Sequence, residues 1–132
     1  MRDIEYKGTL LAQIVSIDEC GEEFNFFTRQ EDALQIGLFR YGEGRVIQNH
    51  VHNVFPRTAD KTCEMLLVLR GRMRADIYTN ERELVRSEEV RANELIILLD
   101  GGHGFQVLEP DTVILEAKNG PYFGVAQDKV KF

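Results

Sequence analysis

The stretch EMLLVLRGRMRADIYT, residues 64–79, is typical of two β-strands that meet at Gly71. Each half has the length of an ordinary strand, and the glycine between them is a residue that interrupts strands. The Asn80-Glu81 pair that follows predicts a tight hairpin turn. The middle of the chain is therefore expected to be β-structure.

Similar segments continue on both sides of this stretch. They are short, many of them alternate between apolar and polar residues, and turn residues separate them, which is the signature of an all-β protein. Eight or more such segments in one chain of this length predict a sandwich or a barrel. The other predicted strands cover residues 10–17, 33–41, 45–52, 83–91, 94–99, 103–108 and 112–118.

Two further segments have a different pattern. Thr28 and Glu31 have the spacing of a helix capping box, so residues 28–35 could form one helical turn, in competition with the strand that starts near Leu34. Residues 119–132 contain glycine, proline and charges, and are expected to form an ordered extension rather than a core strand. The whole chain, 1–132, is expected to be a single domain.

Composition limits the function classes. The net charge is −6 and the isoelectric point is near 5.1, which disfavours a general electrostatic attraction to nucleic acid or to an anionic membrane. We find no apolar run long enough to cross a bilayer and no secretion signal. The two cysteines, Cys20 and Cys63, form no C-x-x-C motif. We therefore expect a cytoplasmic protein with two free thiols.

Two of the three histidines, His50 and His52, lie two residues apart within the predicted strand 45–52. In a strand, residues i and i+2 point to the same side, so both imidazoles share a face with Gln48. Two such imidazoles, about 7 Å apart, can bind one metal ion. A bare H-x-H pattern is also compatible with two histidines that have no ligand role. The flanking residues are therefore needed to choose between these two interpretations.

Gly44 and the histidine pair give G-x5-H-x-H, and Glu64 and Gly71 give E-x6-G. Together these resemble the first motif of the cupin superfamily, the small double-stranded β-helix proteins. The third histidine, His103, follows an apolar strand and a Gly-Gly turn, where the second cupin motif has its histidine. The resemblance covers about residues 33–118, with N-terminal strands in 1–32 and residues 53–63 as a lengthened loop.

The resemblance implies an all-β jelly-roll fold, in which two antiparallel sheets close a conical barrel around a pocket. It also implies a divalent metal ion (Fe, Mn, Ni, Co or Zn) in that pocket, and a homodimer that could exchange its N-terminal strand. Three imidazoles and one carboxylate are suitable ligands for such an ion. A metal-free pocket in which the same histidines act as bases remains open. The implied metal ligands are His50, His52, Glu64 and His103.

Other residues are candidates for the same pocket. Gln48 could bind a substrate or a metal-bound water, and either Gln48 or Glu64 could take part in catalysis. Arg57 and Lys61, in the lengthened loop, could meet an anionic substrate. Phe105 shares the face of His103 and could contact a substrate with its ring. For each of these residues, an ordinary packing or solvated role is the alternative.

Three hypotheses about function follow. The first is a metal-dependent enzyme, of the oxygenase or isomerase type, that acts on a small oxygen-rich metabolite. The second is a metal-free isomerase or epimerase of nucleotide sugars, with Arg57 and Lys61 holding the diphosphate. The third is a non-catalytic module that binds a small ligand. None of the three involves nucleic acid or a membrane.

Overall fold

A computed structural model describes residues 1–19, 21 and 25–132. The stretch 64–79 forms two strands, β5 (Glu64–Arg70) and β6 (Arg72–Tyr78), as predicted. Gly71 between them has φ +82°, and a Cβ at this position would collide with the side chain of Thr112. Only glycine adopts such a backbone without strain, so it can lead the chain sharply from one sheet into the other. The predicted turn at Asn80-Glu81 is also confirmed.

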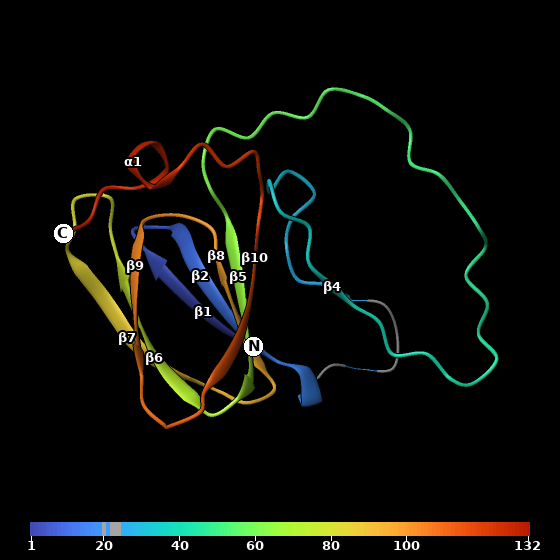
Figure 1. Ribbon diagram of the computed structural model, residues 1–132, viewed down its shortest axis with the longest axis horizontal. Helices are drawn as coiled ribbons and strands as arrows, with labels where there is room; N and C mark the ends of the chain where they lie inside the picture. Colours follow the sequence, from blue (N-terminus) through green and yellow to red (C-terminus); the bar gives the residue numbers. More distant parts are fainter. Residues whose placement is uncertain (20, 22–24) are drawn as a thin grey trace.

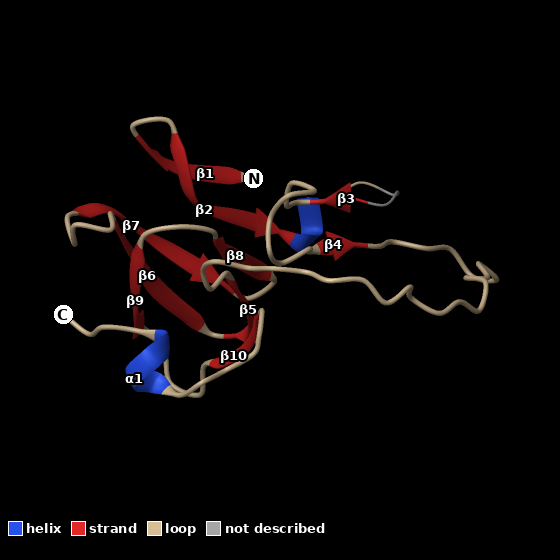
Figure 2. Ribbon diagram, turned by 90° about the horizontal axis from the view of Figure 1, so that it is seen from above, coloured by secondary structure: helices blue, strands red, loops and turns tan. Residues whose placement is uncertain are grey.

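Eight of the ten described strands form two antiparallel sheets that face each other (Figures 1 and 2), and β3 (Asn25–Phe26) and β4 (Gly37–Leu38) form a separate two-stranded sheet. The larger sheet has the order β1-β2-β8-β5-β10, with β1 (Arg2–Tyr6), β2 (Thr9–Ser16), β8 (Glu94–Leu98) and β10 (Val113–Lys118). The smaller sheet has the order β7-β6-β9, with β7 (Leu84–Arg91) and β9 (Gly102–Val107). The predicted all-β class and the strands predicted over 83–118 are therefore confirmed.

The sheets do not close into the expected barrel. Among the described strands, β9 is hydrogen-bonded only to β6, and β10 only to β5, so each forms the free edge of its sheet on the same side of the sandwich. At this side a small molecule can enter the interior between β9 and β10 without passing through a sheet. The structure supports the coarse class, an antiparallel all-β sandwich, and leaves the closed jelly roll a prediction.

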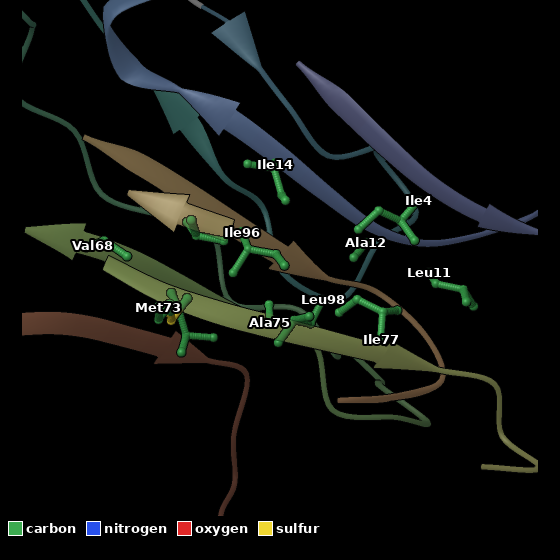
Figure 3. Packing of buried hydrophobic residues seen from close by; sticks show 12 residues of the cluster. Ile4, Leu11, Ala12, Ile14, Val68, Met73, Ala75, Ile77, Ile96 and Leu98 are labelled. Carbon is green, nitrogen blue, oxygen red and sulfur yellow. The ribbon is translucent and has the colours of Figure 1, made fainter. Parts of the chain in front are cut away.

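The core fills the space between the two sheets, and Figure 3 shows its packing. Burying an aliphatic side chain of this size contributes about 1.5–3 kcal/mol to stability. The labelled members are Ile4, Leu11, Ala12, Ile14, Val68, Met73, Ala75, Ile77, Ile96 and Leu98.

A second apolar cluster lies on the outer face of the larger sheet. Leu95, Ile97 and Leu99 pack there against Phe27 and Ile36. The segment that covers this face contains the short hairpin β3 (Asn25–Phe26) and β4 (Gly37–Leu38). Strand β8 is therefore buried on both faces, which explains its unbroken apolar sequence.

The N-terminal half differs from the prediction. The strand predicted over 33–41 is reduced to the two residues of β4. The helical turn over 28–35 is not formed, because the Thr28 hydroxyl accepts a hydrogen bond from the Ile36 amide (3.0 Å) instead of capping a helix. Of the strands expected in 1–32, β2 matches the predicted 10–17 closely.

The prediction of a strand over 45–52 is wrong for this single chain. Every residue from 39 to 62 is exposed, and none of 39–62 belongs to a helix or strand. This stretch makes a wide excursion away from the sandwich between β4 and β5 (Figure 1). We call residues 41–58 the arm. The physical reason is that a strand needs a neighbour for its backbone groups, and the arm has none in its own sheets.

The C-terminal residues 119–132 cross one end of the sandwich and contain a single short helix, α1 (Val125–Asp128). The last residue, Phe132, packs edge-on against Tyr78 with the ring centres 5.1 Å apart. Tyr122 and Phe123, which could have anchored this tail, are mostly exposed. No helix in the described ranges is long and apolar enough to span a membrane.

Candidate functional site

Glu64 and His103 meet inside the open side of the sandwich. Glu64 begins β5 and lies opposite Leu98, a core residue. His103 on β9 lies opposite Ile77, also a core residue. Residues directly opposite on neighbouring strands share a face, so both side chains point inward from facing sheets. The Oε2 atom of Glu64 is 3.1 Å from Nε2 of His103.

The surroundings favour an ionised Glu64. A hydrogen bond with His103 lowers the pKa of this carboxyl below 4.5, against the burial that raises it. The charges of His103, Lys129 and Lys118 lower the pKa of Glu64 further. Lys118, its register partner on β10, places its ammonium 3.8 Å from Oε1. Because the Glu64 side chain is only 6% exposed, its charge is balanced by these partners rather than by water.

Lys118 also connects this pair to the C-terminal tail. Its ammonium is 3.3 Å from a carboxylate oxygen of Asp128 in α1, and it lies 4.7 Å from the centre of the Tyr122 ring. The hydroxyl of Thr62, just before β5, also contacts Asp128, at 3.3 Å. The tail is therefore held over the same end of the sandwich as Glu64.

A cavity of about 990 Å³ opens at this end, with Glu64 and His103 among its lining residues. Phe105 and Phe132 give it apolar surface, and the Phe105 ring lies 5.2 Å from the His103 ring. The size is at the upper end of the range for small-molecule sites, roughly 300–1,000 Å³. Its charged lining has more carboxylates than ammonium groups: Asp60, Glu64, Asp100, Glu116 and Asp128 against Lys61, Lys129 and Lys131.

Asp100 organises the rim of the cavity. Its carboxylate accepts hydrogen bonds from the Lys61 ammonium (2.6 Å), the Asn80 amide (3.2 Å) and the Gly101 backbone N–H (2.7 Å). Burial raises the pKa of Asp100, but these hydrogen bonds outweigh it and keep the pKa below 3.8. The pairing with Lys61 ties the end of the 39–62 stretch to the turn between β8 and β9.

The remaining predicted site residues lie on the arm, away from this pair. His50 and His52 contact each other edge-on, 5.2 Å between ring centres, and His50 Nδ1 is 2.9 Å from the Gln48 carbonyl oxygen. Arg57 lies over the Phe55 ring, 3.8 Å from its centre. All of these residues are exposed. The structure thus brings together Glu64, His103 and Phe105, with Lys61 at the rim, and leaves His50, His52, Gln48 and Arg57 apart.

The donor set therefore does not fit the implied metal ion. In the described part of the chain, no three His, Cys, Asp or Glu side chains are grouped so that they could hold a metal. Glu64 and His103 are two donors, whereas protein sites for divalent transition metals use three or four. The other two expected ligands, His50 and His52, would have to move with the arm.

Three charged residues of the site were not predicted from the sequence: Lys118, Asp100 and Asp128. A signal existed for Lys118, because it lies four residues after the inward-facing Ile114 and so shares its face, which places a charged residue at a core position. Asp128 and Asp100 act through distant partners, which no local pattern reveals. Cys63 has no role at the pair: it is buried, which raises the pKa of its thiol, and its sulfur lies near the Leu99 carbonyl.

Comparison of the chain with protein-family models, with curated proteins and with solved structures finds no match.

Proposed function

We propose that this chain is an enzyme that acts on a small oxygen-rich metabolite, with Glu64 and His103 as its proton-transfer pair. The observation that carries the proposal is the 3.1 Å contact between the buried Glu64 carboxylate and His103 Nε2, at the wall of a cavity large enough for a metabolite. Buried charged pairs cost stability unless they are well compensated, and they concentrate at functional sites.

The chemistry follows from the orientation of the pair. A carboxylate that accepts a hydrogen bond from Nε2 favours the tautomer in which Nδ1 carries the free lone pair. His103 can then take a proton at Nδ1 from a carbon beside a carbonyl, or from a hydroxyl group, and return it to a neighbouring atom. Glu64 stabilises the imidazolium that forms in between. Lys118 keeps Glu64 ionised, and the Phe105 ring restricts the orientation of the imidazole.

The lining of the cavity bears on the substrate class. Carboxylates outnumber lysines there, and Lys61 is already paired with Asp100. Such a lining suits a neutral polyol, sugar or hydroxycarbonyl compound, whose hydroxyl groups donate to carboxylates. It is poorly suited to the diphosphate of a nucleotide sugar, for which Arg57 on the arm was the other expected cation. We therefore favour a sugar-like or hydroxycarbonyl substrate without phosphate groups.

The cupin resemblance adds a divalent metal ion to this proposal. If one is bound, it supplies Lewis-acid polarisation of a substrate oxygen. Since the donors that meet in this structure do not fit such an ion, the proton transfer above relies on Glu64 and His103 alone.

The test is a panel of aldoses, ketoses and hydroxyketo acids incubated with the protein in D₂O and followed by proton NMR. Exchange of a carbon-bound proton for deuterium reports proton abstraction directly. We expect exchange with the wild-type protein, its loss in His103→Gln and a large loss in Glu64→Gln. Arg86→Gln, on β7 away from the cavity, is the control for folding and should leave exchange unchanged.

Binding of a panel compound with no exchange and no conversion would contradict the enzymatic proposal and favour the binding module. Exchange that survives in His103→Gln would contradict the assignment of the pair. Exchange that is also lost in His52→Gln, together with bound metal in the wild-type protein, would favour the metal-dependent form over the metal-free one.

A further inference from the structure

Two apolar surfaces of this chain are exposed to water and do not touch each other. The first is the arm. Its exposed apolar side chains include Val46 and Val51, which are 79% and 90% exposed. In the described part of the chain, the hydrogen bonds and ring contacts found for residues 42–58 stay within the arm and its base at Tyr41. The arm thus presents a large apolar surface with no cover of its own.

The second surface is the open side of the sandwich. Phe105 and Val107 on β9 lie opposite Ala75 and Met73, both fully buried, so they face the interior. They are nevertheless 39% and 57% exposed. Inward-facing apolar residues stay exposed only where the next strand of the sheet is missing.

The arm has the sequence that would fill this gap. As a strand, residues 45–52 would have Val46, Gln48, His50 and His52 on one face, and the stretch has the length of β9 plus two residues. A free sheet edge offers unpaired backbone N–H and C=O groups to an added strand. Pairing would satisfy the backbone of both partners and cover the interior beside Phe105.

The direction of the arm points to a second molecule. Both of its ends are held: β4 is paired with β3, and Lys61 is paired with Asp100. Between these ends the arm projects away from its own sandwich, and in both views its middle lies on the opposite side from β9 (Figures 1 and 2). Two copies related by a twofold axis can exchange arms, so that one interface buries both arms and both open sides.

We propose that residues 45–52 pair as a strand with β9 of a second copy of this chain, in a reciprocal exchange. With the imidazoles on the inward face, His50 and His52 would enter the cavity that holds Glu64 and His103 of the partner subunit. The pairing itself does not depend on the proposed function, since it rests on the exposed edge and the exposed arm. The N-terminal strand β1, which the resemblance also allows to exchange, is paired with β2 within this chain.

The test uses single cysteines placed on separate copies, in a Cys20→Ser/Cys63→Ser background. One copy carries Asn49→Cys or Val51→Cys on the arm, and the other carries Gly104→Cys or Gln106→Cys on β9, all on the face that would point away from the cavity. The two copies are mixed under mild denaturation, refolded and oxidised. We expect a disulfide-linked pair of chains with at least one of these combinations. A copy with Arg86→Cys, on the far edge strand β7, is the matched control and should give no link.

The native mass is measured alongside, by light scattering. We expect twice the 15.2 kDa of one chain, and a single chain when residues 45–54 are replaced by a glycine-serine linker. A link that forms only when both cysteines are in one chain, with a monomeric mass, would overturn the exchange and place the arm on its own β9. A dimer that persists without the arm, or a monomer with no link, would overturn it as well. None of these outcomes depends on catalytic activity, so the proposed function fails or stands separately.

Discussion

At the scale of single residues, Glu64 is the group whose chemistry depends most on its neighbours. Its lowered pKa means that it stabilises the fold above its unfolded value of 4.5. This stabilisation is lost as the pH falls through the still lower value of the folded state. Replacing Glu64 by glutamine removes the charge and keeps the shape.

We therefore expect Glu64→Gln to be less stable than wild type by about 1–3 kcal/mol at neutral pH. The variant loses a buried charged hydrogen bond, and Lys118 loses the Glu64 carboxylate as a partner. The difference should shrink steadily below a pH of about 4. Urea unfolding across this range measures both. A difference that stays constant with pH would show that the carboxylate is not held as an ion by His103 and Lys118.

Gly101, beside the site, makes a second prediction at this scale. It has φ +73°, and a Cβ there would collide with the Tyr78 carbonyl oxygen. We expect Gly101→Ala to lower the free energy of unfolding by about 1–3 kcal/mol or more, through backbone strain and displacement of Tyr78. Gly104→Ala is the matched control, because its Cβ would meet no atom within 4 Å. Equal stability of the two variants would contradict this account of the turn.

At the scale of elements, β2 and the strands of the second half of the chain could be predicted from the sequence, whereas the region 28–62 could not. Strands β5 to β10 follow one another through short turns, which mark their ends clearly in the sequence. Among these described strands, only β6 and β7 pair as sequence neighbours, and the other pairings join strands far apart in the chain. Val46, Ile47 and Val51 give residues 45–52 an alternation that is weaker than that of β6. Alternation shows that a segment can bury one face, but it does not show that a neighbouring strand is available.

The difference between a local pattern and a contact with a distant partner also explains which site residues could be predicted. The cupin resemblance predicted that Glu64 and His103 share a site, and they meet because each lies on the inward face of its strand. Lys118 and Asp128 were missed because they reach Glu64 through pairing across a sheet and through the tail. His50 and His52 lie apart from the pair because the arm that carries them projects away from the sandwich.

The arm itself allows a prediction about an element. Val46→Asp together with Val54→Asp places charges where the exchange requires apolar contact, and we expect a shift from dimer to monomer by at least tenfold in the dissociation constant, about 1.4 kcal/mol. Sedimentation over a range of protein concentrations measures this shift. Glu43→Gln, a change near the base of the arm that removes a charge, is the control. If the double aspartate variant dimerises like wild type, the arm is not at the interface.

At the scale of the whole molecule, this acidic chain has its site at the open side of the sandwich. The proposed exchange would bring the arm of a second copy, with His50 and His52, to the same place. The cupin resemblance places four ligands at one point, and a single chain brings two of them there. If exchange supplies the other two, bound metal should accompany the dimer. We expect elemental analysis of protein purified without a histidine tag to find metal in dimer fractions and little in monomer fractions. Equal metal content in both would contradict this link.

If Glu64 and His103 form one functional pair, the carboxylate determines which nitrogen of His103 carries the proton. Long-range nitrogen–proton NMR spectra distinguish Nδ1-protonated from Nε2-protonated imidazole, and His50→Gln and His52→Gln spectra identify the His103 signals among the three histidines. We predict that in metal-free protein neutral His103 carries its proton on Nε2, facing Glu64, and that Glu64→Gln, a weaker acceptor, changes the tautomer populations. A His103 signal with the proton on Nδ1, or one that Glu64→Gln leaves unchanged, would contradict the account.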